Sequence, residues 1–375
     1  MYDGLLQVRT GGNQLGISSS TLVVFADDVA VVTTGHTTRI LEDVTNNAPA
    51  AVTEWMDRAE LSLSVEKTEA IILTNKRGYE RPDFRIRGTS IEIKDQIRYL
   101  GIELHRVLGF RAHIEAAASK ALSTSQALSK IMPNVGGSGQ QKRRLMSTVV
   151  LSKLLYAAPI WSVALVFDRN IQSILRPQRT IALRTAMAYR TVSTAAIMVV
   201  AGVVPAHLLA WERTERYEIR RDPNKAALEK EIREEVLKKW QIEWDKEVTG
   251  RWTWRFIRDA KSWFNRRSGA VDFHLTQVLT GHGCFRQYLK RMGKLDVSSC
   301  IDCQAVIDDA EHAIFVCDRW WRDRRTLEAT LGQCLRPENF VELMMGSPDN
   351  WKVISKFINN LLSTREEEER IRQRR

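Results

Sequence analysis

Residues 21–32, which read TLVVFADDVAVV, decide the fold of the first part of the chain. Two adjacent carboxylates, Asp27 and Asp28, separate two apolar runs that have the composition of β-strands. Two like charges between buried strands would repel each other and resist desolvation. A bound divalent cation removes both problems, and hard oxygen ligands suit Mg²⁺. The stretch predicts a β-hairpin over residues 21–34 with the carboxylates at its turn. The alternative is a surface hairpin with a solvated turn.

The segments after the hairpin predict an α+β fold that becomes mainly helical. Apolar residues at helical spacing predict a helix over residues 38–59, which Pro49 should kink or divide. Lys67 precedes a predicted buried strand at residues 69–74, and the Tyr99–Ile102 stretch predicts a strand whose Gly101 permits close backbone approach. Further predictions are short antiparallel strands over 84–104, helices over 110–132 and 140–164, a solvated helix over 228–248, and a frayed or disordered segment over 365–375.

The composition points to nucleic acid as a partner. The formal net charge is +11 and the sequence pI is about 9.5, which favours a polyanionic partner. A membrane surface is the alternative, but no uninterrupted apolar span of transmembrane length is present, and the start of the chain does not read as a secretory signal. We therefore expect an intracellular, reducing location, nuclear or cytoplasmic, with no membrane partner. The five cysteines should be thiols or metal ligands.

A cysteine and histidine cluster predicts a structural zinc site. Cys300 and Cys303 are separated by two residues, and His312 and Cys317 are separated by four. Zinc takes four such ligands in a tetrahedron, and four protein ligands make a closed site rather than a catalytic one. The alternative is four unrelated residues in a reduced core. His274 and His282 are more typical of core or turn histidines, so we leave them out of the ligand set.

A basic and aromatic stretch over residues 251–267 predicts contact with nucleic acid. Arginines can bind phosphates while aromatic rings stack on bases. The alternative is an amphipathic helix with a tryptophan core face and a solvated basic face. The candidate binding residues are Arg251, Arg255, Arg258, Lys261, Arg266 and Arg267.

The ordered set of motifs resembles the reverse transcriptase of non-LTR (LINE-type) retrotransposons, most closely the arthropod R1-like group. The Phe25-Ala26-Asp27-Asp28 box, Lys67-Thr68 and Tyr99-Leu100-Gly101 match the family's motifs in order. The resemblance extends from Tyr2 to about Arg325 and includes a Cys-Cys-His-Cys motif.

The resemblance implies an RNA-directed DNA polymerase with two Mg²⁺ ions. By this similarity, Asp27 and Asp28 would hold Mg²⁺ and Lys67 would assist the leaving pyrophosphate. Tyr99 and Gly101 would lie against the primer. The implied partners are an RNA template, a DNA primer or target, and other proteins encoded by the element.

The resemblance also implies a division of the chain into a partial polymerase palm, an antiparallel sheet with a helix, and a mostly helical thumb, followed by a small zinc-binding module. The expected boundaries are 1–105 for the palm, 106–205 for the thumb, 206–270 for the Trp/Arg-rich region, 271–335 for the zinc module, and 336–375 for a helix and charged segment. The family's third metal carboxylate and its fingers would precede residue 1. The chain is therefore expected to be a C-terminal portion that is inactive alone.

Two other functional classes remain open at this stage. One is a nucleic-acid-binding zinc protein with a vestigial polymerase site. The other is a structural helical protein with a zinc staple, which the net charge disfavours. The polymerase and the nucleic-acid-binding zinc protein differ in whether a third carboxylate reaches Asp27 and Asp28.

Overall fold

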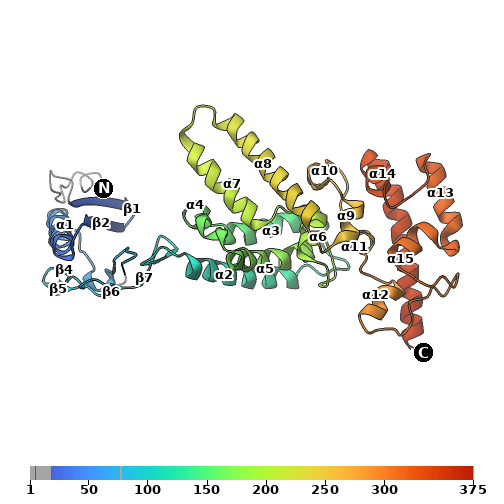
Figure 1. Cartoon of the computed structure of the whole chain (residues 1–375), viewed down its shortest axis with the longest axis horizontal. Helices are drawn as coiled ribbons and strands as arrows, with labels where there is room; N and C mark the ends of the chain where they lie inside the picture. The colour runs from blue at the N-terminus through green and yellow to red at the C-terminus, as the bar shows by residue number, and fades with distance from the viewer. Residues whose placement is uncertain (1–4, 6–17, 77, 375) are drawn as a thin grey trace. The chain divides into compact units, whose positions relative to one another are not determined.

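The structure is a computed structural model that describes residue 5, residues 18–76 and residues 78–374. In this part of the chain helices predominate and the strands pair into small sheets, which confirms the predicted α+β class (Figure 1). The chain folds as two compact units, Met1–His113 and Ile114–Arg375.

The first unit is built around the predicted hairpin. Strand β1 (Ser18–Phe25) pairs antiparallel with β2 (Asp28–Gly35), with Phe25 opposite Asp28. Helix α1 (Thr38–Arg58) follows and packs on one face of the hairpin, and Thr37 caps it by accepting a 3.3 Å hydrogen bond from the Ile40 amide. Pro49 does not divide α1. Alternation along the strands explains the packing, because every second residue faces the helix. These inward residues are Leu22, Val24, Val29 and Val31.

The remaining strands of this unit are short and form three further two-stranded sheets. Only Ala70–Ile71 of the predicted 69–74 strand pairs, as β3, parallel to β6 (Ile93–Lys94). The predicted strand Tyr99–Ile102 is wrong: Leu100 and Gly101, with φ of 44° and 82°, form the turn between two strands. Two-residue hairpin turns favour positive φ at both positions, which glycine adopts without strain. The other paired strands are β4 (Arg85–Ile86) with β5 (Thr89–Ser90), and β7 (Gln96–Tyr99) with β8 (Ile102–His105).

From residue 111 onward the described chain is helical. The apolar helix α6 (Thr194–Ala201) is almost wholly buried and lies at the centre of the core of the second unit. Tryptophans fill much of the space around it, because large flat side chains bury the most apolar area per residue. The other α-helices are α2 (Arg111–Lys130), α3 (Gln140–Leu154), α4 (Ala158–Trp161), α5 (Asp168–Thr185), α7 (Ala206–Glu218), α8 (Lys225–Lys246), α9 (Arg251–Phe256), α10 (Ala260–Asn265), α11 (Phe273–Thr280), α12 (Arg286–Arg291), α13 (Trp321–Leu331), α14 (Phe340–Gly346) and α15 (Pro348–Arg374).

Two helical segments are more deeply packed than the sequence predicted. Helix α8 was expected to be solvated, but it buries Trp240 and Trp244, and the Trp244 indole donates a 2.8 Å hydrogen bond to the carbonyl of Ile257. The segment expected to be frayed or disordered continues α15 to Arg374, and it buries Arg365 and Glu369. Both predictions were wrong because most residues of these segments are charged, and the few residues that pack against the core give no clear periodic pattern.

In the described part of the chain, no single helix is long and apolar enough to cross a membrane. Two bent helix pairs, α3 with 158–166 and α6 with 206–221, meet the length and composition only when joined.

Candidate functional site

Three cysteines and one histidine of the second unit converge on one point. The Cys300 and Cys317 sulfurs are 3.9 Å apart, the Cys303 and Cys317 sulfurs 4.0 Å, and the Cys303 sulfur lies 3.3 Å from Nε2 of His312. All four ligand atoms lie within 4.8 Å of one another. Zinc–sulfur bonds of about 2.3 Å give tetrahedron edges of roughly 3.5–3.8 Å. The donor set and spacing therefore fit a tetrahedral zinc ion.

Local backbone geometry explains why these spacings work. The Cys300 amide donates a 2.8 Å hydrogen bond to the carbonyl of Ala305 across a tight turn in which Gln304 has a φ of 62°. That turn brings both sulfurs of the Cys-x₂-Cys pair to the same side. Of the other two ligands, His312 begins a short π-helical segment, His312–Val316, and Cys317 directly follows it. A π turn joins residue i to residue i+5, so His312 and Cys317 meet the same point.

The site is buried and electrostatically unsuited to free thiolates. Cys300, His312 and Cys317 are buried and Cys303 is half-buried. Burial, followed by the neighbouring Cys300 and Cys303, raises the pKa of the Cys317 thiol to about 12. A divalent metal reverses this preference because it stabilises the thiolate form. With four protein ligands, the cluster is suited to a structural metal rather than to catalysis.

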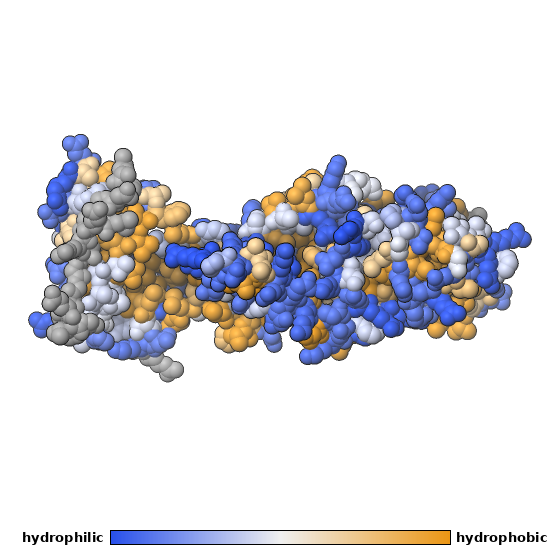
Figure 2. Space-filling model, turned by 90° about the horizontal axis from the view of Figure 1, so that it is seen from above, coloured by the Kyte–Doolittle hydropathy of each residue, from blue (hydrophilic) through white to orange (hydrophobic). Residues whose placement is uncertain are grey.

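The Asp27 and Asp28 carboxylates lie at the turn of the β1–β2 hairpin, as predicted, but they are exposed. The expectation that apolar flanks would bury them is wrong, because the strands bury one face only. On the outer face Val23, Phe25 and Val32 stay exposed, Phe25 by 63%; Figure 2 shows apolar side chains at the surface of this unit. Among the described residues, no third potential metal ligand joins the pair.

The other predicted polymerase residues occupy separate places in the first unit. Lys67 is exposed at the end of a 3₁₀ turn, Val65–Lys67, and none of the hydrogen bonds or ion pairs within the described ranges joins it to Asp27 or Asp28. Tyr99 is half-buried in β7, and its hydroxyl is buried without a hydrogen-bond partner there. Gly101 is exposed at the β7–β8 turn.

Half of the predicted basic cluster at residues 251–267 is engaged within the fold. Arg255 forms ion pairs of 2.6 Å with Glu311 and with Glu338. Lys261 pairs with Glu234. Arg266 is wedged beside Trp263, donates a 2.6 Å hydrogen bond to that residue's carbonyl, and has its pKa lowered to about 10 by burial and then by Arg144.

The remaining three cations of this cluster are exposed. The Arg251 guanidinium lies 3.9 Å from the centre of the Trp254 ring and that of Arg258 lies 5.3 Å from it. Arg267 is exposed beyond α10. The surface that this stretch offers to a polyanion is therefore smaller than its sequence suggests.

A stronger basic region was missed from the sequence. Residues 116–211 contain eleven lysines and arginines but one acidic residue, Asp168, so they carry +10 of the chain's net charge of +11. Four of the arginines, Arg143, Arg144, Arg179 and Arg184, donate hydrogen bonds within the fold. Arg143 alone donates to the carbonyls of Pro133, Gly136, Ser138 and Arg184. Four exposed lysines on α2 and α3 form no ion pair in the described chain: Lys120, Lys130, Lys142 and Lys153. The sequence signal for this region is its length of chain with a single acidic residue, Asp168.

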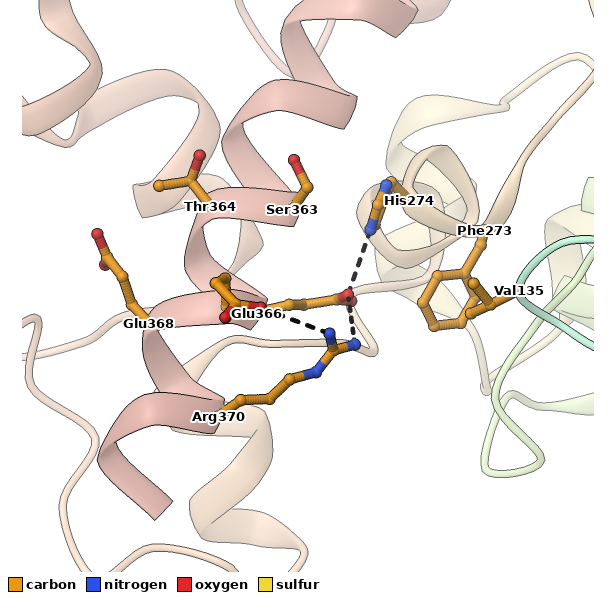
Figure 3. Close-up of a pocket in the computed structure, with 9 residues that line it drawn as sticks. Val135, Phe273, His274, Ser363, Thr364, Glu366, Glu368 and Arg370 are labelled. Atoms are coloured by element: carbon orange, nitrogen blue, oxygen red, sulfur yellow. Dashed lines mark hydrogen bonds and ion pairs between the residues drawn. The ribbon is translucent and has the colours of Figure 1, made fainter. Parts of the chain in front are cut away.

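A shallow groove of about 600 Å³ lies between α11 and α15, with Val135 and Phe273 at one side (Figure 3). His274 fixes its wall: Nδ1 lies 2.7 Å from Oδ1 of Asn359 and Nε2 lies 3.4 Å from Glu366. Burial alone would lower the pKa of His274, but the hydrogen bonds to Glu366 and Asn359 raise it. These interactions attach α15 to α11, so His274 has a structural role, as the sequence indicated.

Comparison with known proteins gives one consistent result. Over 375 aligned residues, the chain is 26% identical to a Retrovirus-related Pol polyprotein from type-1 retrotransposable element R1 2 of Nasonia vitripennis, covering 94% of this chain and 91% of the relative. It is 27% identical to the R1 Pol polyprotein of Bradysia coprophila, covering 79% of this chain and 31% of that longer relative. A second R1 Pol polyprotein of Nasonia vitripennis is 24% identical over 79% of this chain.

No family model and no solved structure matches the chain. The matches to these relatives over most of the chain confirm its resemblance to the Pol polyproteins of R1-like non-LTR retrotransposons.

Proposed function

We propose that the chain is part of an RNA-directed DNA polymerase and that Asp27 and Asp28 are its Mg²⁺ ligands. The observation that carries this proposal is the placement of two adjacent carboxylates at the exposed turn of a hairpin. Exposure leaves both side chains accessible to a metal ion and to a nucleoside triphosphate. The packing of the inner hairpin face against α1 fixes the base from which they project.

Each residue has a defined part in this proposal. Asp27 and Asp28 bind metal through their carboxylate oxygens, the hard ligands that Mg²⁺ prefers. Magnesium, when bound, supplies activation of the primer hydroxyl and neutralisation of the triphosphate. Lys67 is the proposed cation or proton donor for the departing pyrophosphate. Residues 1–105, with Tyr99 and Gly101 at the primer, are the proposed palm.

Helices α2 and α3, within the proposed thumb at residues 106–205, are the proposed grip on nucleic acid. Their exposed lysines have no carboxylate partner in the described chain, so their charge is available to phosphates. Leu145 and Val149 are exposed between Lys142 and Lys153 on the same helix. An apolar stripe between cations can contact sugar and base surfaces while the cations hold the backbone. RNA template and DNA primer are the proposed ligands.

DNA synthesis by a chimera tests the proposal. In the longer Bradysia coprophila R1 Pol polyprotein, the matching segment is replaced by this chain, and primer extension on an RNA template is measured with Mg²⁺. We expect Asp27→Asn or Asp28→Asn to abolish incorporation, whereas the matched control Glu54→Gln, another exposed carboxyl of the same unit, keeps it. Equal incorporation by the Asp variants and the control would refute the proposal.

A second candidate function is nucleic-acid binding by a zinc protein with a vestigial polymerase site. The observation that favours it is the lack of a third ligand around Asp27 and Asp28 among the described residues, beside a complete Cys/His set and an acid-poor basic region. In this case the chain binds RNA and DNA with affinity that falls with salt, and neither Asp27→Asn nor Asp28→Asn alters any activity.

A further inference from the structure

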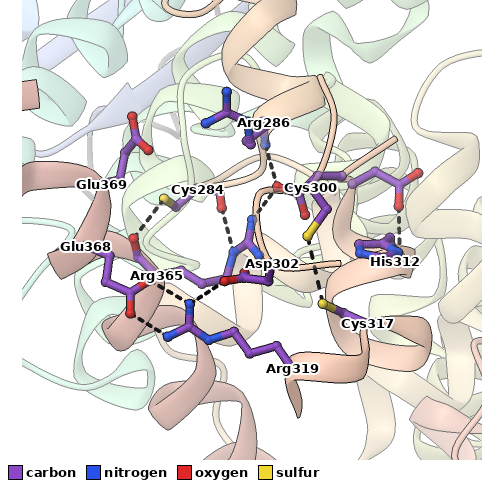
Figure 4. Close-up of polar contacts among 12 residues, drawn as sticks. Cys284, Arg286, Cys300, Asp302, His312, Cys317, Arg319, Arg365, Glu368 and Glu369 are labelled. Carbon is purple, nitrogen blue, oxygen red and sulfur yellow. Dashed lines mark hydrogen bonds and ion pairs between the residues drawn. The ribbon is translucent and has the colours of Figure 1, made fainter. Parts of the chain in front are cut away.

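The last turns of α15, residues 365–374, are attached to the loops that carry the zinc ligands. The sequence of this segment is almost entirely charged, and such a helix end would ordinarily be solvated. Here Arg365 and Glu369 are buried. Arg365 binds Asp308, from the segment between Cys303 and His312, and the neighbouring Glu368 binds Arg319, as Figure 4 shows for Glu368. The hydrogen bonds of Glu369 come from Arg372 and Gln373 of its own helix.

Arg319 joins both halves of the ligand set to α15. It follows Cys317 by two residues, and its Nη1 donates 2.8 Å to Asp302, which lies between Cys300 and Cys303. The same guanidinium binds Glu368 of α15 at 2.9 Å and through a second contact. One side chain therefore connects Cys-x₂-Cys, His-x₄-Cys and the helix.

A buried ion pair makes a second connection. Nη2 of Arg365 lies 2.5 Å from Asp308, which precedes His312 by four residues and is 1% exposed. Asp308 also accepts a 3.1 Å hydrogen bond from the amide of Arg286. Nε of Arg365 donates 3.1 Å to the carbonyl of Cys284. A buried guanidinium without its carboxylate is costly, so Arg365 can stay docked only while the loop holds Asp308 in place.

The loops have little regular structure of their own. Between Cys300 and Cys317 the chain has no strand, and its helical segment is π-helical from His312 to Val316. Segments of this kind depend on the metal for their conformation, because the free energy of metal binding becomes folding free energy. Asp302 and Asp308 are carried on these segments, so their positions depend on occupancy of the ligand set.

We propose that metal binding and docking of residues 365–374 of α15 are thermodynamically coupled. When the ligand set is occupied, Asp302 and Asp308 are fixed and the helix end is held. When the metal is removed, both carboxylates lose their positions and the helix end is released. Coupling of this kind is reciprocal, so weakening the contacts from α15 also weakens metal binding. This proposal concerns the fold and does not depend on DNA synthesis.

Hydrogen exchange tests the first direction of the coupling. Amide exchange in the full chain is followed by mass spectrometry with zinc bound and after chelation. We expect peptides from residues 365–374 to exchange about tenfold faster or more after chelation, as for local opening. Peptides from α5, in the core of the same unit, are the internal reference and should change little. Unchanged protection of 365–374 after chelation would overturn the proposal.

Zinc affinity tests the reverse direction with two neighbouring residues. Glu368→Gln removes the charge of the α15 partner of Arg319, whereas Glu367→Gln changes an exposed carboxyl that pairs with Arg370. Both residues lie on α15, away from the ligands in sequence, so both variants should fold, which circular dichroism verifies. Loss of the hydrogen bonds that position metal ligands weakens metal binding by about 10–100-fold. We expect zinc to bind several-fold more weakly to Glu368→Gln, and we expect the zinc affinity of Glu367→Gln to be unchanged. Equal affinities would refute reciprocity.

Discussion

The amide of Cys317 donates a 2.8 Å hydrogen bond to the carbonyl oxygen of His312, five residues earlier. This π turn sets the rotation between the two ligands, because an α turn over the same residues would place them on different sides of the helix. The spacing is therefore part of the metal site.

Deletion of Val316, an exposed residue inside the turn, should remove zinc from the protein. The deletion shortens the spacing by one residue, so the five-residue π turn that joins His312 to Cys317 cannot form, whereas Val316→Ala keeps the spacing. Zinc per chain is measured by mass spectrometry after gel filtration in metal-free buffer. We expect one zinc in Val316→Ala and much less in the deletion variant. Full zinc occupancy in the deletion variant would show that the spacing is unimportant.

Replacing Arg365 by methionine should strongly destabilise the second unit. Arg365→Met leaves Asp308 buried without its partner, and breaking a buried pair costs about 3–5 kcal/mol. The control Arg370→Met removes the pairs that an exposed arginine makes with Glu366 and Glu367, and pairs at an exposed residue are worth about 0–1 kcal/mol. Urea unfolding of the two variants gives the comparison, and similar free energies of unfolding would contradict the assigned role of Asp308.

The His274–Glu366 pair should give a defined pH dependence of stability. The folded pKa of His274 is raised from 6.5, so its contribution is complete below that value and is lost as pH rises through the folded pKa. The folded pKa of Glu366 is lowered from 4.5: burial opposes this, but the bonds from His274 and Gln277 prevail. Its contribution is present above pH 4.5 and fades as pH falls through the folded pKa.

Melting temperatures of the wild type and of His274→Gln, measured from pH 4 to pH 9, check this dependence. We expect the largest difference between about pH 4.5 and pH 6.5 and a smaller one at higher pH. A difference that is independent of pH would mean that the His274 charge contributes nothing.

The lysines of α3 should set the salt dependence of nucleic-acid binding. Lys142→Gln and Lys153→Gln should each reduce the slope of log affinity against log salt concentration by about 1, because each removes about one phosphate contact. Lys352→Gln is the control, since Lys352 pairs with Asp349 on an exposed part of α15. Fluorescence anisotropy with an RNA–DNA duplex provides the affinities. Slopes that match the control would exclude α3 from the binding surface.

The sequence predicted the elements whose signals are local. The hairpin at residues 18–35 and helix α1 follow from period-two and helical patterns, and the four residues of the Cys/His cluster follow from their spacing alone. The turn at Leu100–Gly101 was misread because an apolar residue beside glycine is equally consistent with a strand. Turn geometry depends on φ at both positions, which composition does not reveal.

The failures concern long-range contacts. The burial of Arg365 depends on Asp308, which lies far away in the sequence, so no local pattern could indicate that residues 365–374 are held. Likewise, Arg255 and Lys261 looked available for phosphates until their partners Glu311 and Glu234 were placed beside them. The exposure of Asp27 and Asp28 follows from which hairpin face packs on α1, and the apolar flanks alone suggested burial.

Divalent metal binding at Asp27 and Asp28 is measured most directly by titrating the full chain with Mn²⁺, a paramagnetic substitute for Mg²⁺, and following amide resonances. We predict selective broadening of residues 25–30 that disappears in the Asp27→Asn, Asp28→Asn double variant. Broadening of the hairpin turn that persists in the double variant, or no selective broadening there in the wild type, would contradict a metal role for this carboxylate pair.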